Sequence, residues 1–137
     1  MAFEKPILIQ TFTAASTMSA ASQQFILVKL DSSADAKCHP CTAVTDIPIG
    51  VLQNLPAVGE LAEVMVLGVS KVRVGATDLS AGVQICTDTT SRAAVYTPGT
   101  TSSNAYNIGR VISLDATDND AALVTCLVNC INLNRAL

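Results

Sequence analysis

The chain has 137 residues, which suits a single domain with a sizeable core. Half of its residues are hydrophobic and only 14% are charged, whereas a typical globular chain carries about 25% charged residues. Interface cores are depleted of charge, so this composition favours a chain whose surface is partly covered by other subunits. The alternative is a polar but neutral surface rich in alanine, serine and threonine.

The charge pattern excludes several classes of function. Eight basic residues are scattered singly, the net charge is −3 and tryptophan is absent, so we expect no nucleic-acid partner. Glutamine, serine and threonine interrupt the charge-free stretch 6–28, which predicts no membrane partner, and Glu4 argues against a signal peptide. The five cysteines are an odd number, which indicates reduced thiols in a protein made in a cytoplasm.

The first 22 residues have the character of an extended arm. Apolar side chains at Phe3, Ile7, Ile9 and Phe12 are followed by a run of small residues without clear periodicity. Such a run buries little surface by itself, and ordering each backbone residue costs about 1–2 kcal/mol. The sequence therefore predicts an N-terminal arm over 1–22 that contacts a neighbouring subunit, and a single β-domain over 23–137.

The middle of the chain reads as short strands joined by turns. Apolar runs rich in valine, leucine and isoleucine alternate with glycine or proline every few residues, which is typical of a sandwich or barrel. We therefore predict an all-β fold, a small antiparallel β-sandwich or barrel. The residues predicted to form its structural turns are Gly50, Pro56, Gly59, Gly68, Gly75 and Gly82.

Alternation of side chains predicts which faces of the strands are buried. Segment 61–67 is apolar on both faces except at one position, which predicts burial on both sides. Segment 70–74 alternates apolar or small residues with Lys71 and Arg73, which indicates one solvated face. The other predicted strands are 24–30, 37–44, 83–86, 92–96, 108–112 and 121–133, with an exposed loop at 98–104 and an acidic turn at 115–120. In 121–133, one predicted face carries Cys126, Val128 and Cys130 and the other carries Leu127, Asn129 and Ile131.

The one motif with chemical potential is Cys38-His39-Pro40-Cys41. Two thiols at this spacing can bind zinc or form a redox disulfide. A closed zinc site needs four ligands, however, and the chain has a single histidine and no second pair of cysteines at this spacing. We therefore predict a structural turn at Cys38 and Cys41, with no metal site, no cofactor and no catalytic residues, so the protein is expected not to be an enzyme.

The order of four segments carries a family resemblance. Residues 49–54 (IGVLQN), 56–60 (PAVGE), 64–72 (VMVLGVSKV) and 107–112 (NIGRVI) together resemble the capsid cement, or head decoration, proteins of tailed bacteriophages. The resemblance covers roughly residues 24–130. The cysteines and the alanine- and serine-rich arm are not part of the family's pattern.

The resemblance implies a β-sandwich or barrel that binds the outer surface of the phage head as a homotrimer. Its partners would be other copies of the chain and the major capsid protein, whose subunit contacts it would stabilise. It would be synthesised in the host cytoplasm and reside in the virion. Two alternatives remain open: another virion β-subunit, such as a tail-tube or spike-base protein, and a secreted binding module.

Overall fold

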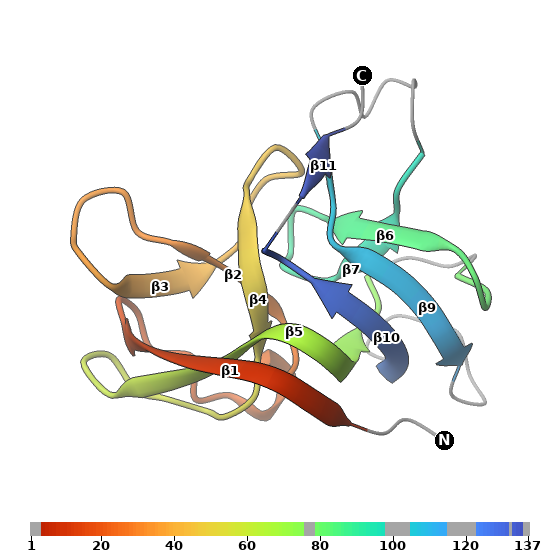
Figure 1. The fold of residues 1–137 in the computed structure, drawn as a ribbon. Coiled ribbons are helices and arrows are strands. Elements are labelled where there is room, and N and C mark those ends of the chain that lie inside the picture. The colour runs from red at the N-terminus through yellow and green to blue at the C-terminus, as the bar shows by residue number, and fades with distance from the viewer. Residues whose placement is uncertain (1–3, 76–78, 98–104, 115–122, 132, 136–137) are drawn as a thin grey trace.

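The structure, a computed structural model, describes residues 4–75, 79–97, 105–114, 123–131 and 133–135 (Figure 1). Within these ranges the only helical element is the short 3-10 turn η1 (Ala21–Gln23), and no helix has the length and apolar character needed to span a bilayer. The all-β prediction is confirmed. The strands are β1 (Lys5–Ala14), β2 (Leu27–Leu30), β3 (Lys37–Pro40), β4 (Pro48–Leu52), β5 (Leu61–Arg73), β6 (Gln84–Thr87), β7 (Ala93–Val95), β8 (Tyr106–Asn107), β9 (Gly109–Leu114), β10 (Leu123–Asn129) and β11 (Asn134–Arg135).

Nine of these strands form one continuous sheet in the order β1-β3-β2-β4-β5-β10-β9-β6-β7. The sheet is mixed rather than purely antiparallel, because β1 runs parallel to β3 where Thr13 pairs with Lys37. The opposite edge of β1 pairs with β5, from Lys5 opposite Val69 to Thr13 opposite Leu61. The strands β1, β3, β2, β4 and β5 therefore close into a ring.

The long strand β5 belongs to a second ring as well. Its C-terminal half pairs with β10, from Leu67 opposite Asn129 to Arg73 opposite Leu123. The sheet continues through β9 and β6 to β7, and a bridge between Val74 and Ala93 returns it to the end of β5. The fold is therefore two small barrel-like rings that share β5, as the crossing of β5 between the two halves in Figure 1 shows.

Each ring has its own buried core. The β1 ring encloses a cluster built from Ala14, Met18, Ile26, Val28, Cys38, Leu52, Ala62 and Val64. The other cluster contains Leu27, Val51, Val72, Val74, Ile85, Ile108, Val111, Val124, Cys126 and Val128 among its members. Alternate residues of β2 serve the two cores, because successive side chains of a strand point to opposite faces.

The predicted faces of the strands agree with the structure in two places and differ in one. Ser70, Val72 and Val74 are buried as the alternation in 70–74 predicts. Cys126 and Val128 are likewise buried, with exposed residues between and after them. Segment 61–67 is not buried on both sides, because Leu61 is exposed and the outer face of this part of β5 is only partly covered.

Two of the predicted turn glycines lie inside strands instead. Gly50 lies in β4 and Gly68 in β5, each where a neighbouring strand passes too close for a side chain. A Cβ atom on Gly68 would lie 2.7 Å from the carbonyl oxygen of Lys5 and 2.8 Å from the nitrogen of Ile7. These two glycines permit close approach of strands rather than chain reversal, so the turn prediction is wrong for them. Gly59 and Gly82 do lie in turns.

The segment predicted to be an arm contributes a strand to the main sheet. Beyond β1, the N–H of Met18 donates to the carbonyl oxygen of Pro56 at 2.8 Å, and the side chains of Ala14 and Met18 are buried. The packing therefore continues across the predicted boundary at residue 22. Three predictions lie outside the described residues: the contact at Phe3, the loop at 98–104 and the turn at 115–120.

Candidate functional site

The Cys-x-x-Cys motif divides its thiols between the two cores. Cys38 lies in β3 and packs in the core of the β1 ring, whereas Cys41, just after β3, packs in the other core. Both side chains are fully buried. Among the described residues, no three histidine, cysteine, aspartate or glutamate side chains are grouped so that they could hold a metal ion. The predicted structural turn is wrong, because Cys38, His39 and Pro40 lie in β3 and the two thiols pack in separate cores.

Burial makes these thiols weak acids. Desolvation raises the pKa of Cys126 to about 12, and desolvation together with the nearby Asp46 raises the pKa of Cys41 to about 12. Desolvation also raises the pKa of Cys38 to about 11. A reactive cysteine needs a lowered pKa and access to solvent, so nucleophilic or redox chemistry finds no support at these positions.

Because the pKa values of the buried thiols are raised, the free energy of unfolding should depend on pH in the alkaline range. An unfolded thiol ionises near its ordinary pKa of about 8.5, while the folded protein keeps the proton. The unfolded state then binds fewer protons, so the free energy of unfolding should fall from about pH 8.5 towards pH 10. Urea titrations across this window should show the fall, and the Cys126→Ala variant should show a shallower one. An unchanged slope in that variant would contradict the buried neutral thiol.

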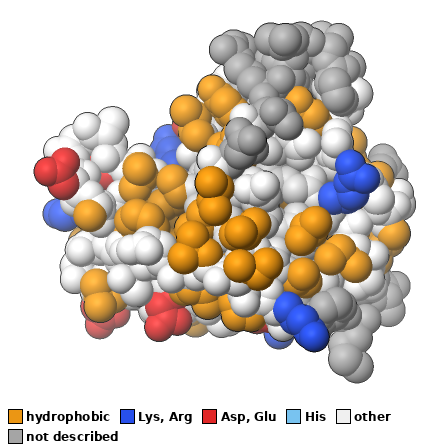
Figure 2. All heavy atoms as spheres, viewed as in Figure 1, with side chains coloured by type: hydrophobic (Ala, Val, Ile, Leu, Met, Phe, Trp, Pro, Cys, Tyr) orange, Lys and Arg blue, Asp and Glu red, His pale blue; other side chains and the backbone are white. Residues whose placement is uncertain are grey.

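One candidate contact surface is an exposed apolar face, which we call the β1 face. It consists of Ile7, Leu8, Leu67, Val69 and Leu127 on three adjacent strands, with Leu8 opposite Leu67 and Val69 opposite Leu127. Ile7 is 73% exposed and Leu127 is 47% exposed. Figure 2 shows hydrophobic side chains gathered across the centre of this view, where Figure 1 places β1, β5 and β10.

Basic side chains flank this face on both sides. Four residues lie in a row, opposite one another on neighbouring strands, and the first and the last of them are basic. Lys5 lies opposite Val69, and Arg110 of β9 lies opposite Leu127. Neither Lys5 nor Arg110 forms an ion pair with another described residue, whereas Lys71 pairs with Glu4 at 3.8 Å. The row therefore presents an apolar centre between two cations.

A second candidate surface is a groove of about 610 Å³ beside β2, which we call the loop groove. It is lined by Lys29, Leu30, Asp31, Ser32, His39, Thr45, Asp46, Ile47 and Ile49. Leu30 is 49% exposed and Ile47 is 55% exposed, so the groove also offers apolar surface to a partner.

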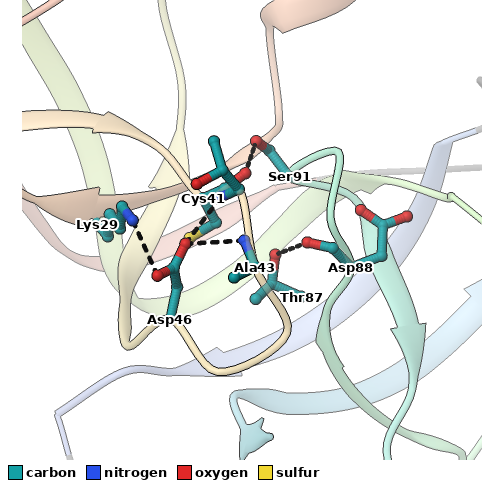
Figure 3. Close-up of polar contacts among 8 residues, drawn as sticks. Lys29, Cys41, Ala43, Asp46, Thr87, Asp88 and Ser91 are labelled. Atoms are coloured by element: carbon teal, nitrogen blue, oxygen red, sulfur yellow. Dashed lines mark hydrogen bonds and ion pairs between the residues drawn. The ribbon is translucent and has the colours of Figure 1, made fainter.

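Asp46 holds the wall of this groove in place. Its carboxylate forms an ion pair with the Nζ of Lys29 at 2.8 Å. It also accepts hydrogen bonds from the backbone N–H groups of Thr42 and Ala43 at 2.7 and 3.0 Å (Figure 3). Burial raises the pKa of Asp46, but the bonds from Lys29 and the two N–H groups outweigh it, so the pKa stays below its usual value. The carboxylate is therefore ionised at neutral pH and ties β2 to the loop before β4.

A neighbouring bond fixes the same loop to the other ring. The hydroxyl of Ser91 donates to the carbonyl oxygen of Cys41, and the hydroxyl of Thr87 donates to the carbonyl oxygen of Asp88 at 3.0 Å (Figure 3). The groove is thus walled by a loop that is tied down at both ends, so its shape is built into the fold.

Two of the predicted contact residues lie on the surface and one packs against the core. Ile7 and Ile9 are exposed on β1, whereas Phe12 packs against the core of the β1 ring. Sequence reasoning missed Leu30 and Ile47 as surface residues. The alternation in 121–133 placed Leu127 on the face opposite Cys126 and Val128, and that signal could have named it as a contact residue.

Comparison with known proteins bears on what such a surface does. A family model described as phage cement protein matches residues 6–129, and no curated protein matches the sequence. Among solved structures, the N base of the head fiber gp8.5 of bacteriophage phi29 is 18% identical with a TM-score of 0.59, and the match covers 93% of this chain and 98% of that one. That likeness shows a shared fold. With the family match spanning nearly the whole chain, the protein belongs to the phage cement protein family and is a structural protein of the phage capsid.

Proposed function

We propose that this protein binds the outer surface of the phage head as a homotrimer and stabilises contacts between neighbouring major capsid protein subunits. The observation that carries the proposal is the cement-family match over residues 6–129. The exposed β1 face and the loop groove supply apolar contact surface in a chain with few charges. Its role is then structural, outside on the virion after synthesis in the host cytoplasm, with no catalysis and no cofactor, nucleic acid or membrane involved.

The physical basis is burial repeated over many copies. Fully burying one large aliphatic side chain contributes about 1.5–3 kcal/mol, so an exposed residue such as Ile7 has most of that free energy still to gain. Three linked copies make the second and third contacts at high effective concentration, so weak individual contacts add to firm attachment. Attachment across a seam then opposes separation of the capsid subunits on either side.

The contact at the N-terminal segment is assigned to Ile7 and Ile9. Both are exposed on the part of β1 that pairs with β5 and not with β3, so one edge of the strand is open to a neighbouring chain there. Phe12 is assigned to the core instead, because it packs against the buried cluster of the β1 ring. Deleting residues 1–20 would also remove a paired strand, so single substitutions at Ile7 and Ile9 are the cleaner test of attachment.

The proposal predicts both the mass and the binding of the purified protein. Light scattering coupled to size exclusion should give three times the chain mass of 14.2 kDa. Undecorated heads of the same phage should carry the protein down in a sedimentation assay, and Ile9→Asp should weaken that binding at least tenfold. A protein that stays monomeric and remains in the supernatant with heads would contradict the proposal.

A further inference from the structure

A ring of three identical chains needs two different surfaces on each chain. A two-fold dimer can use one self-complementary patch, but a three-fold ring joins one patch of each copy to another patch of the next. The inference that follows rests on the proposed homotrimer and concerns which two surfaces meet. Two exposed apolar surfaces of this chain meet the requirement, one at the start of β1 and one in the loop groove.

The first surface is the ridge formed by residues 5–9, at the start of β1. It projects Ile7, which is 73% exposed, together with the exposed side chains of Leu8 and Ile9. Lys5 precedes them and has no ion-pair partner among the residues described. The ridge is thus apolar with one available positive charge.

The second surface is the loop groove, which has the complementary character. Leu30 and Ile47 give it an apolar lining, and its volume of about 610 Å³ falls within the range of about 300–1,000 Å³ that is typical of binding sites. Asp46 is already paired with Lys29, so the negative charge left for a partner is that of Asp31. The carboxylate of Asp31 accepts only the N–H and hydroxyl of Ser33 among the described residues, at 2.9 and 2.7 Å.

The two surfaces lie at different places on one chain. In Figure 1 the start of β1 lies at the lower right, whereas β3, β2 and the loop before β4 lie on the left and towards the top. The groove is lined by residues in or next to these last three segments and by none of β1. A contact between ridge and groove must therefore join two copies.

We propose that the ridge of one copy docks in the loop groove of the next. Ile7 and its neighbours pack against Leu30 and Ile47, and the ammonium group of Lys5 pairs with the carboxylate of Asp31. The contact is head to tail, so it closes into a ring when the rotation between copies is one third of a turn. The rest of the β1 face, including Leu127, remains open for the major capsid protein.

Two charged variants test this arrangement, with a third as the matched control. Ile7→Asp spoils the ridge and Ile47→Asp spoils the groove, so each should lower trimer association at least tenfold by analytical ultracentrifugation. Val58→Asp alters a residue outside both surfaces whose exposure, 62%, lies between the 55% of Ile47 and the 73% of Ile7, and it should leave the trimer intact. Far-ultraviolet circular dichroism spectra that match the wild type, with a cooperative thermal transition, establish that the variants are folded.

Mixing the two variants tests whether the ridge and the groove contact each other. The Ile47→Asp chain keeps its ridge and the Ile7→Asp chain keeps its groove, so together they should form a dimer through one intact contact but no closed ring. The charge exchange Lys5→Glu with Asp31→Lys in one chain should likewise restore the trimer that Lys5→Glu alone weakens. A mixture that remains monomeric at high concentration, with no rescue by the exchange, would overturn the proposal.

The same variants distinguish this inference from the proposed function. If Ile7→Asp and Ile47→Asp stay trimeric but lose binding to heads, these surfaces contact the major capsid protein; the docking contact is then overturned and the cement function stands. If the wild-type protein neither trimerises nor binds heads, the proposed function itself fails. If the wild-type protein is trimeric and only the two variants dissociate, the docking contact is supported.

Discussion

Replacing Gly68 with alanine should lower the free energy of unfolding by about 3 kcal/mol or more. Gly68 has a φ of +139°, a conformation that costs an L-residue about 1–2 kcal/mol. Its new Cβ would also press on backbone atoms of β1, and overpacking of this kind costs about 1–3 kcal/mol. The atoms in its way are the carbonyl oxygen of Lys5 and the nitrogen of Ile7, which cannot withdraw without loosening the pairing of β1 with β5.

Gly59→Ala is the matched control for this prediction. Gly59 also has positive φ, at +85°, but nothing lies within 4 Å of the position its Cβ would take. It should therefore cost only the conformational part, about 1–2 kcal/mol. Urea unfolding at a fixed protein concentration measures both values. Equal costs at the two glycines would mean that β1 does not pass close over Gly68.

Replacing Leu52 with alanine should cost about 2–5 kcal/mol, because the side chain is fully buried in the core of the β1 ring. The lost free energy combines the transfer of the removed atoms with the cavity that they leave. Leu52 lies in β4 beside β5, so the cavity would open at the strand that both rings share. The measurement is again the midpoint and slope of a urea titration.

Leu55→Ala tests the same substitution three residues later. Leu55 is exposed and lies outside the buried clusters, so its truncation should cost less than about 1 kcal/mol. A Leu52 variant as stable as the Leu55 variant would contradict the placement of the core. Leu67 should fall between the two, because it is half-buried on the outer face of β5.

Alternation within a strand was the part of the fold that the sequence predicted best. Val72 and Val74 against Lys71 and Arg73, and Cys126 and Val128 against Leu127, each assign a buried and an outer face correctly. These patterns depend only on neighbours along the chain, since side chains alternate with a period of two. All-β architecture follows from the same information together with the spacing of turns.

The interpretation of the glycines failed for a non-local reason. A glycine between apolar runs predicts a turn, and at Gly59 that prediction fits the structure. At Gly68 the requirement comes from β1, a strand more than fifty positions earlier in the chain, which crosses close above it. The sequence does not say which strands will be neighbours, so it could not separate a turn glycine from a close-approach glycine.

The same limit applies to the start of the chain and to the candidate contact surfaces. The exposed character of Ile7 and Ile9 could be predicted because their apolar run is followed by small residues. Pairing of β1 with β5, and the core position of Phe12, could not be predicted from that run. The loop groove is likewise a product of the fold, since Leu30 and Ile47 come from segments that only tertiary structure brings together.

Electron cryomicroscopy of undecorated heads, before and after addition of the purified protein, tests the central claim most directly. Attachment as a cement protein predicts added density on the outer surface, in groups of three copies that each span contacts between major capsid protein subunits. The copies should present the β1 face, with Leu127, towards the capsid. Heads with no added density at saturating protein, or density confined to the tail or the interior, would contradict the account.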